Sequence, residues 1–435
     1  MGVTSFHISE EERYAMRESN RAEAHASRGA GDVLTEILRG GARELLRQAV
    51  EAELASHLEA WSHLRLETGQ QRVVRHGHGP ARSILTGIGP VSVRRPKTRD
   101  RGASGEDRIR FSSAILPRFA RRTKSLDAVL PTLYLRGVST GDFGEALSAL
   151  VGAEAPGLGP GVIGRLKAAW AQDHDRWQRR DLSDREYVYV WADGIYLRCR
   201  LEEDRQCVLV LLGATASGRK ELLGFQTGFR ESGQSWRELL EDLRGRGLRE
   251  PPRLAVGDGA LGFWSALEKV FPGTAHQRCW VHKTANVLNA LPKSRRANAK
   301  RDLHQIWMAA DRREAERALK TFSRKYGAKY PKAVRLLEKD RKTLLAFYDF
   351  PAEHWRHIRT TNPIESVFAT VRHRTVRSKG CLSHRTARTM VFQLVMAASR
   401  SWRLLNGSPK LPLVLEGVKF KDGQQADDTE IQAAA

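Results

Sequence analysis

Cysteine and long apolar runs are both scarce in this sequence. The 435 residues contain four cysteines, which are Cys199, Cys207, Cys279 and Cys381. So few thiols in so long a chain argue against a disulfide framework and favour a reducing compartment. No run approaches the roughly 18 apolar residues of a membrane-spanning helix, and no lipidation motif is present. The acidic stretch Glu10–Glu12 is unlike a secretory signal. We therefore expect a cytoplasmic protein that binds no membrane.

Acidic residues are also in deficit. Asp and Glu number 50 against 73 Lys and Arg, which gives a formal net charge of +23. Because this excess is spread along the chain, it predicts a polyanionic partner, which we interpret as nucleic acid. The length predicts roughly two to four domains.

One apolar stretch, Glu186–Arg200, organises the rest of the chain. It is rich in β-branched and aromatic residues and apolar on both faces, which predicts a strand inside a covered sheet. Its one internal carboxylate is Asp193. A lone carboxylate in a core strand is costly unless something binds it. Alternatively, Asp193 only caps an Asp-Gly bend. Partner carboxylates elsewhere would distinguish the two interpretations.

Two partner carboxylates are present. Asp258 ends a second short apolar strand, and Glu365 lies in the first turn of a helix with Asn362 at its N-cap. Two strand-end aspartates and a helix-borne glutamate supply the oxygen ligands of hard divalent cations. Paired ions held in this way support phosphodiester chemistry. The sequence therefore predicts Asp193, Asp258 and Glu365 as catalytic residues and as ligands of Mg²⁺, with Mn²⁺ as a substitute.

The segments between these acids predict an α/β fold. Strands are expected at Glu186–Leu201, Cys207–Ala214, Glu221–Thr227, up to Asp258, and at Thr274–Val281, with helices at Ser235–Arg244 and Phe263–Phe271. This order predicts a ribonuclease-H-like mixed sheet in residues 181–282, completed by residues 360–405. Between them, residues 283–359 predict an all-helical insertion with 20 Lys and Arg against 8 Asp and Glu. Such a surplus favours a surface that grips DNA over a merely solvated one. Residues 406–435 are expected to be a flexible tail.

The N-terminal third is expected to precede this core as separate regions. Residues 1–30 are polar and predict a loose arm. Residues 31–101 predict a helix over Asp32–Ala60 followed by a hairpin around the Gly87–Pro90 turn, with a loop at Arg75–Pro80.

Residues 102–180 predict a helical, DNA-binding region of helix-turn-helix type. The expected helices span about Ser125–Leu135 and Asp142–Leu150, with a third from Val162 onward. A recognition helix enters the major groove by its first residues, so Arg165 and Lys167 are predicted DNA contacts. An ordinary helical connector is the alternative.

Four motifs together resemble those of a known family. They are Ala192-Asp193-Gly194, Gly257-Asp258-Gly259-Ala260, Gln277–Lys283 and Arg359–Ser366. In this order they resemble the mutator-like family of bacterial insertion-sequence transposases, over about residues 30–405. The resemblance implies a DDE transposase whose triad falls on Asp193, Asp258 and Glu365, and terminal inverted repeats as its substrate. It places the family's Cys-x-x-His signature on Cys279 and His282.

Four further residues are candidates near this site. Cys279 and His282 have the spacing of half a zinc site, but the sequence offers no second such pair nearby. We interpret them as stabilising the junction with the insertion, with His282 near the metal site or the DNA. Arg372 lies seven positions after Glu365, on nearly the same helix face, and is predicted to clamp a phosphate. Arg374 is the second predicted DNA contact on that helix.

The expected reaction uses two metal ions. Water cuts the transposon end, and the freed 3′-hydroxyl then attacks target DNA. The expected partners are double-stranded DNA, both inverted repeats and target, and a second copy of the chain on that DNA, as a homodimer or larger. The expected location is the bacterial cytoplasm, with the nucleoid. Two alternatives remain: a ribonuclease-H-like nuclease or resolvase without strand transfer, and a domesticated transposase that only regulates by binding DNA.

Overall fold

The computed structural model describes eight segments of the chain. They are residues 33–102, 107–136, 143–151, 160–197, 206–228, 231–259, 261–377 and 384–426. The chain forms two compact units. The first, N-terminal unit comprises Met1–Tyr134 and Val138–Gly161. The second comprises Leu135–Gly137 and Val162–Ala435. Each unit is described by itself. The predicted arm of residues 1–30 lies outside the described residues.

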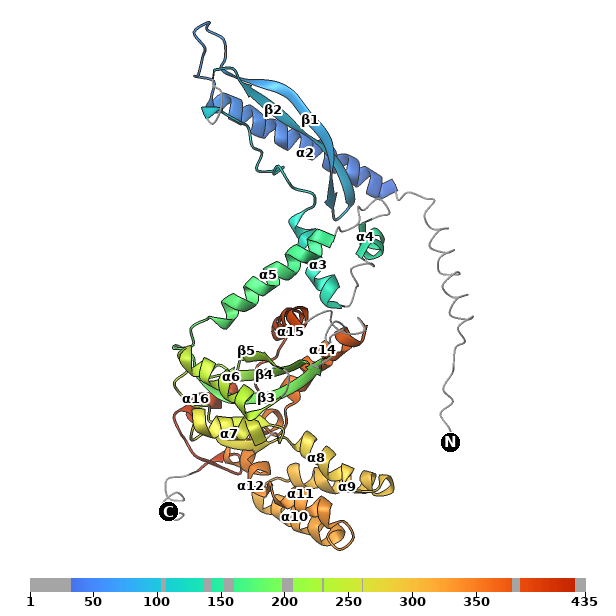
Figure 1. Ribbon diagram of the computed structural model, residues 1–435, viewed down its shortest axis with the longest axis vertical. Helices are drawn as coiled ribbons and strands as arrows, with labels where there is room; N and C mark the ends of the chain where they lie inside the picture. Colours follow the sequence, from blue (N-terminus) through green and yellow to red (C-terminus); the bar gives the residue numbers. More distant parts are fainter. Residues whose placement is uncertain are drawn as a thin grey trace, which may run out of the picture. The chain divides into compact units, whose positions relative to one another are not determined.

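The N-terminal unit contains one long helix and a hairpin. Helix α2 (Val33–Ala60) packs along the antiparallel strands β1 (Val73–Thr86) and β2 (Gly89–Asp100), as Figure 1 shows. Val50 of the helix and Val91 and Val93 of β2 lie in the core between them. Val91 and Val93 are two positions apart in β2, so they share its inner face. The hairpin is longer than predicted, because Arg75–Pro80, expected as a loop, lies within β1 between register shifts.

Three helices follow, as the sequence predicts. They are α3 (Lys124–Arg136), α4 (Phe143–Val151) and α5 (Pro160–Gln178). The connections at Gly137–Thr140 and in most of the Gly152–Gly161 turn lie outside the described residues. The second half of α5 packs into the second unit, where His174 is 2% exposed and its ring lies 5.1 Å from that of Phe392. This half of the expected recognition helix is therefore part of a hydrophobic core.

A five-stranded mixed sheet lies at the centre of the second unit. Its strands are β3 (Tyr187–Leu197), β4 (Gln206–Thr215), β5 (Lys220–Gly228), β6 (Leu254–Gly257) and β7 (Ala275–Arg278). They lie in the order β5-β4-β3-β6-β7, with β3–β4 and β4–β5 antiparallel and β3–β6 and β6–β7 parallel. The predicted α/β class and all five strands are confirmed. The fifth strand is shorter than expected, since α8 begins at Trp280.

Both faces of the sheet are covered. One face packs against α6 (Gly233–Gly245) and α7 (Leu261–Val270), visible beside the sheet in Figure 1. The other packs against α14 (Asn362–Arg377) and α15 (His384–Ser399). Along β3, Val190 and Ala192 belong to the first core and Tyr189 and Trp191 to the second. This explains why the strand is apolar on both faces before Asp193.

The segment between β7 and α14 is helical, as predicted. It comprises α8 (Trp280–Asn289), α9 (Lys293–Trp307), α10 (Arg312–Tyr326), α11 (Pro331–Glu338), α12 (Arg341–Leu344) and α13 (Trp355–Ile358), with 3₁₀ turns at Ala346–Asp349 and Ala352–His354. Gln277 ties this block to β7, because its side chain donates to the carbonyl of Leu344 at 3.1 Å and accepts from the amide of Phe347 at 2.8 Å. The later part of the block, at α12 and the 3₁₀ turn that follows it, is therefore fixed to the sheet.

The prediction of a flexible tail is wrong for residues 406–426. They form α16 (Leu411–Leu415) and the short pair β8 (Phe420–Lys421) and β9 (Gln424–Gln425). Leu411 is fully buried, and the Gly423 amide donates to the carbonyl of Tyr348 at 3.2 Å. A few buried apolar residues therefore pack this segment onto the core of the second unit. The many polar residues around them led to the prediction of a flexible tail. Within the described residues, no helix combines the length and apolarity that a membrane span requires.

Candidate active site

The two predicted aspartates lie on adjacent parallel strands. Ala192 of β3 is paired with Gly257 of β6, so Asp193 and Asp258, the next residues, follow at the same level of the sheet. This arrangement depends on the parallel pairing of two strands that are far apart in sequence. It brings together the two carboxylates that the sequence predicts as partners.

Asp193 lies in an environment that opposes its charge. Burial, together with the nearby charges of Asp258 and Glu231, raises the pKa of Asp193 to about 7. The positive charge of His282 and a hydrogen bond from the Gly194 amide, 2.8 Å from Oδ1, act in the opposite direction. The carboxylate is thus charged at neutral pH only at a cost, which a bound cation would remove.

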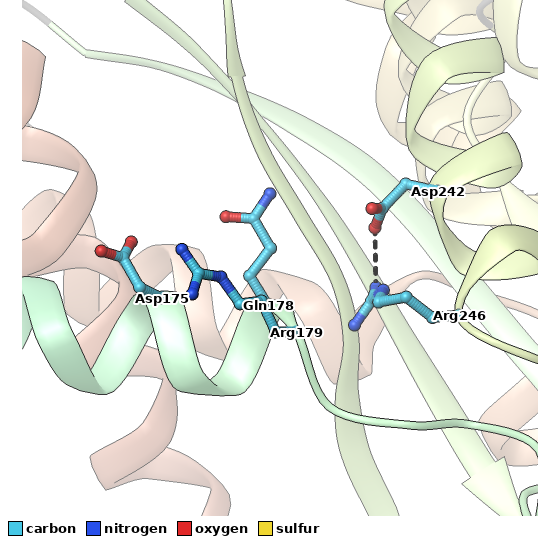
Figure 2. A pocket seen from close by; sticks show the side chains of 5 residues that line it. All are labelled: Asp175, Gln178, Arg179, Asp242 and Arg246. Carbon is cyan, nitrogen blue, oxygen red and sulfur yellow. Dashed lines mark ion pairs between the residues drawn. The ribbon is translucent and has the colours of Figure 1, made fainter.

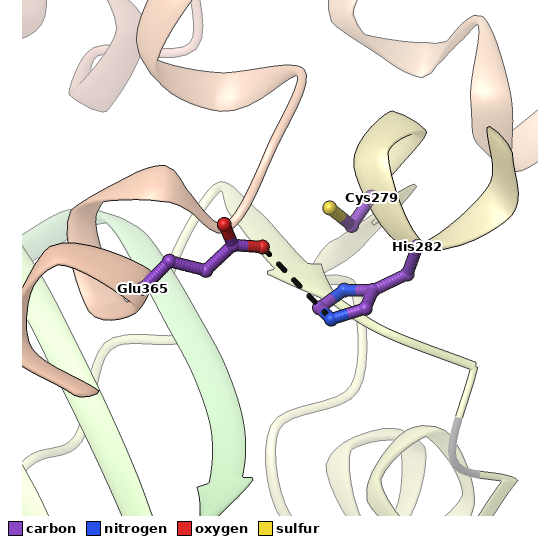
Figure 3. Close-up of side chains that lie close together, drawn as sticks. All are labelled: Cys279, His282 and Glu365. Atoms are coloured by element: carbon purple, nitrogen blue, oxygen red, sulfur yellow. Dashed lines mark ion pairs between the residues drawn. The ribbon is translucent and has the colours of Figure 1, made fainter. Parts of the chain in front are cut away.

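Glu365 approaches the site from α14. Its Oε1 lies 3.9 Å from Nε2 of His282, as Figure 3 shows. The carbonyl of Thr361 accepts hydrogen bonds from the amides of Ile364 and Glu365, at 2.9 and 3.0 Å. Helical bonding therefore begins at Thr361, one residue before the predicted cap at Asn362. Ile364 is fully buried and anchors this first turn in the core.

Cys279 and His282 join the sheet to the start of α14. Cys279 is fully buried, and both the amide and the hydroxyl of Thr361 donate to its sulfur at 3.3 Å. The amide of Cys279 donates to the carbonyl of Gly257 at 2.8 Å. One short segment therefore fixes the strand that carries Asp258 and the helix that carries Glu365. The interpretation of the pair as a junction agrees with these contacts.

His282 is the positive group among these carboxylates. Its hydrogen bond with Cys279 raises the pKa of His282 to about 9 against the effect of burial, and the charges of Cys279, Asp193 and Asp258 add to the rise. Burial raises the pKa of Cys279, but hydrogen bonds from His282 and Thr361 outweigh it, so that pKa is lowered overall. The imidazole is therefore protonated at neutral pH and partly balances the acids.

One trio of side chains has the spacing of a metal site. Among the described residues, Cys279, His282 and Glu365 bring three potential ligand atoms within 4.8 Å of one another. Asp193, Asp258 and Glu365 do not form such a group in this part of the chain. Two ions about 3.5–4 Å apart would spread their ligands more widely than a single ion does. The zinc hypothesis for the Cys-x-x-His pair thus gains a third potential ligand in Glu365.

Three residues near the site escaped the sequence analysis. Thr361 contacts Cys279, as described above, and Glu231 borders Asp193. Arg278 is 7% exposed, and its guanidinium lies against Gly259, where a Cβ atom would overlap it. Its Nε lies 3.5 Å from Asp340. Arg278 and Thr361 lie within the quoted motifs, but the sequence gives them no role, because each contact joins segments that are distant in sequence.

The predicted DNA contacts lie on two helices of the structure. Arg165 is exposed and Lys167 half-buried on α5, whereas Arg372 is exposed on α14, about two turns beyond Glu365. Arg374 belongs to α14, but its side chain lies outside the described part of the structure. The structure places no DNA on these residues, so their roles stay predictions.

Two pockets lie away from the acids. One, at the end of α5, is lined by Asp175, Gln178, Arg179, Asp242 and Arg246, with Asp242 and Arg246 paired at 2.9 Å (Figure 2). Its two acids and two bases balance, and it contains none of the predicted site residues. The other, at the start of β5, is lined by more bases than acids. Its charged residues are Arg180, Asp181, Arg185, Arg219, Lys220, Glu221 and Arg400. That surplus suits a phosphate backbone.

Comparison with known proteins identifies the relatives of the chain. The family model described as "Transposase, Mutator family" matches residues 13–403. The transposase for insertion sequence element IST2 of Acidithiobacillus ferrooxidans is 54% identical over 292 residues, which cover 66% of this chain and 96% of that protein. The transposase for IS6120 of Mycolicibacterium smegmatis is 48% identical, over 69% of this chain and 92% of that protein.

A solved structure is also similar. It is the cryo-EM structure of the simian T-cell lymphotropic virus intasome in complex with PP2A regulatory subunit B56 gamma. The match is 16% identical, covers 50% of this chain and 65% of that chain, and has a TM-score of 0.17, too low to bear on the fold.

Proposed function

This chain belongs to the Mutator family of transposases, and we propose on that premise that it is the DDE transposase of an insertion sequence. It binds the terminal inverted repeats of the element, cleaves the DNA ends and joins the 3′ ends to target DNA. The observation that carries this proposal is the pairing of Ala192 with Gly257, which sets Asp193 and Asp258 side by side. Glu365 completes the triad from α14, where His282 contacts it.

The sheet supports a ribonuclease-H-like core. In sequence order its strands lie as 3-2-1-4-5, with the first three antiparallel and the last two added in parallel. The acids follow from this order, because the first and fourth strands are neighbours. Helices cover both faces of the sheet, so the carboxylates are partly shielded from water. Charges interact more strongly in such a site than they do in water.

The donor set fits Mg²⁺, with Mn²⁺ as a substitute. Asp193, Asp258 and Glu365 offer only carboxylate oxygens, which hard cations prefer. Burial and neighbouring acids raise the pKa of Asp193 to about 7, so its charged form is disfavoured without a cation and a bound Mg²⁺ would stabilise it. Bound in a pair, such ions would activate the attacking oxygen and stabilise the leaving one.

The remaining residues hold this constellation in place. Thr361 and Cys279 fix the start of α14, and with it the direction of the Glu365 side chain. His282 keeps a positive charge between that carboxylate and the aspartates, which limits their repulsion. No Ser or Tyr nucleophile is needed, because the phosphodiester is attacked first by water and then by the 3′-hydroxyl.

DNA is the partner in this proposal, and the contacts assigned to it lie in the second unit. Arg165 and Lys167 contact the inverted repeat, the helical block from α8 to α13 grips the backbone, and Arg372 clamps the phosphate beside the scissile bond. The basic pocket at the start of β5 offers a further backbone contact. Joining requires two transposon ends at once, so the chain acts as a homodimer or larger assembly on DNA.

The test uses the full chain with DNA of the element's own ends and a labelled target. With Mg²⁺, cleaved ends joined to target are the expected product, and Mn²⁺ supports the same product. Cleavage without joining would indicate the nuclease or resolvase, and binding without cleavage the domesticated regulator. Either result would contradict the proposal.

A further inference from the structure

Glu231 lies beside the aspartates, just before α6. The indole Nε1 of Trp236 donates a hydrogen bond to Oε1 of Glu231 at 3.0 Å. The backbone amide of Glu231 donates to the hydroxyl of Tyr196 at 3.2 Å. Trp236 is 1% exposed, and its ring packs on that of Phe263 with centroids 4.9 Å apart. One oxygen of the carboxylate is therefore fixed by a residue that cannot easily move.

The other oxygen of Glu231 faces β3. A Cβ atom at Gly194 would lie 2.9 Å from Oε2, so the missing side chain lets the carboxylate reach the strand next to Asp193. Gly194 is not among the glycines with positive φ, and its backbone suits any residue. Contact with Glu231, not backbone conformation, thus accounts for glycine at this position.

The charge of Asp258 acts on both Glu231 and Asp193. Burial raises the pKa of Glu231, the Trp236 hydrogen bond lowers it, and the charge of Asp258 raises it further. Glu231 in turn is one of the charges that act on Asp193. Neighbouring carboxylates repel one another, and a shared cation would remove that cost.

A buried arginine borders the same site. Arg278 is 7% exposed, and its Nε and Nη1 have no hydrogen-bond partner. The guanidinium lies against Gly259, next to Asp258, whose charge it feels. Asp340, 3.5 Å from Nε, balances the charge of the guanidinium, but the buried Nη1 donor has no hydrogen bond, which points to a ligand with acceptor oxygens, such as a DNA phosphate. The acids therefore adjoin a second feature suited to metal-bound nucleic acid.

We propose that Glu231 is a fourth carboxylate ligand of the divalent metal site, added to Asp193, Asp258 and Glu365. The inference rests on the proposed function, since it assigns one more residue to the same site. Glu231 lies in the segment before α6, which carries none of the other three acids. It would therefore add a ligand from a further part of the fold. The Trp236 hydrogen bond presets the carboxylate, and Gly194 gives it room.

Metal binding by the full chain tests this proposal without DNA or activity. Mn²⁺ is titrated and its free fraction followed by electron paramagnetic resonance. Glu231→Gln keeps the shape and the Trp236 hydrogen bond but loses the charge, and should weaken Mn²⁺ binding roughly 10- to 100-fold. Gly194→Ala keeps all four acids but displaces Oε2, and should weaken binding in the same direction. Glu231→Asp should lie between Glu231→Gln and the unaltered protein.

The matched control is Glu241→Gln on α6. Glu241 is half-exposed and pairs with Arg237, so this variant should bind Mn²⁺ like the unaltered protein. Unchanged binding in Glu231→Gln, with only a lower melting temperature, would make Glu231 a structural anchor and overturn the inference. Asp193→Asn distinguishes failure of the Glu231 inference from failure of the proposed metal site. If it loses Mn²⁺ and Glu231→Gln does not, the inference alone fails. If Asp193→Asn binds normally, the metal site itself fails.

Discussion

Two aspartates at strand positions, one in each unit, have opposite environments. Asp100 ends β2, is 3% exposed, and receives two hydrogen bonds from Arg72, at 2.9 and 3.1 Å. The amides of Gly102 and Ile109 donate to it as well, at 2.9 and 3.0 Å. The Arg72 hydrogen bonds hold the pKa of Asp100 well below its usual range. Asp193 instead has neighbouring acids and a raised pKa.

The difference separates a structural carboxylate from a functional one. The fold provides Asp100 with its own cation and donors, so this residue stabilises the N-terminal unit. Asp193 instead receives a hydrogen bond from the Gly194 amide and shares the positive charge of His282 with the other acids. Its negative charge is therefore incompletely compensated. A fold that tolerates such a deficit is expected to receive the missing cation from solution.

The largest expected effect concerns the acids of the sheet. Asp193→Ala, Asp258→Ala and Glu365→Ala should each lower the single-turnover cleavage rate by on the order of 10³-fold or more, because each removes a metal ligand. Affinity for end DNA, measured by fluorescence anisotropy, should change little. Near-normal cleavage by any one variant would remove that residue from the site.

The next effect is on stability and belongs to Asp100. Asp100→Asn should lower the free energy of local unfolding by roughly 2–4 kcal/mol, since it leaves Arg72 without its partner. Hydrogen exchange of the β1–β2 peptides measures this loss. Asp127→Asn is the control. The Asp127 side chain is 54% exposed and forms an ion pair with Arg122, so its loss should lower the free energy of local unfolding by less than about 1 kcal/mol. Equal costs would show that Asp100 is not a structural anchor.

Two arginines extend the contrast. Arg72→Ala should destabilise the hairpin as Asp100→Asn does. Arg372→Ala should leave the melting temperature unchanged and lower cleavage roughly 10- to 100-fold, with a smaller loss of DNA affinity, because it removes a charged clamp on the reacting phosphate. Arg385→Ala, on α15, is the control for a general loss of charge. Equal losses of cleavage and affinity would make Arg372 an ordinary backbone contact.

The smallest effect concerns pH in the absence of metal. The folded pKa of Asp193, about 7, exceeds its unfolded value of 3.8, so its contribution to stability is present below pH 4 and lost as pH rises through 7. For Asp100 the pKa is lowered, so its contribution is present above pH 4 and lost as pH falls. Asp193→Asn should therefore raise the melting temperature at pH 8 by roughly 2–5 °C.

Calorimetry in chelator at pH 5 and pH 8 measures this difference. The gain should shrink at pH 5, where Asp193 is largely protonated in the folded protein. Added Mg²⁺ should stabilise the unaltered protein more than the variant. A variant that melts lower at pH 8 without metal would show that Asp193 is a structural carboxylate like Asp100.

The sequence predicts the sheet and the three acids because both depend on local patterns. Glu186–Arg200 is apolar on both faces, which only a covered strand requires. Asp193 and Asp258 each end an apolar run, and Glu365 follows a helix start. The α/β class and the family could therefore be inferred without coordinates.

The rest of the site depends on contacts with no local pattern. Glu231 reaches Gly194 from a different element, and Thr361 meets Cys279 across 82 positions. The folded segment after residue 406 depends on a few apolar residues, such as Leu411, that dock on a distant surface. The sequence underestimates the length of the hairpin, because His78 and Gly79 suggest a loop. In the structure, β-bulges accommodate both residues within β1.

A metal-specificity switch at Asp193 tests the central claim most directly. Asp193→Cys replaces a hard oxygen ligand with a softer thiolate, which suits Mn²⁺ better than Mg²⁺. Single-turnover cleavage of end DNA is measured for this variant and the unaltered protein in each metal. If Asp193 binds the metal, cleavage by the variant is lost in Mg²⁺ and at least partly restored in Mn²⁺. Equal activity in both metals, or no recovery in Mn²⁺, would contradict a metal-binding role for Asp193.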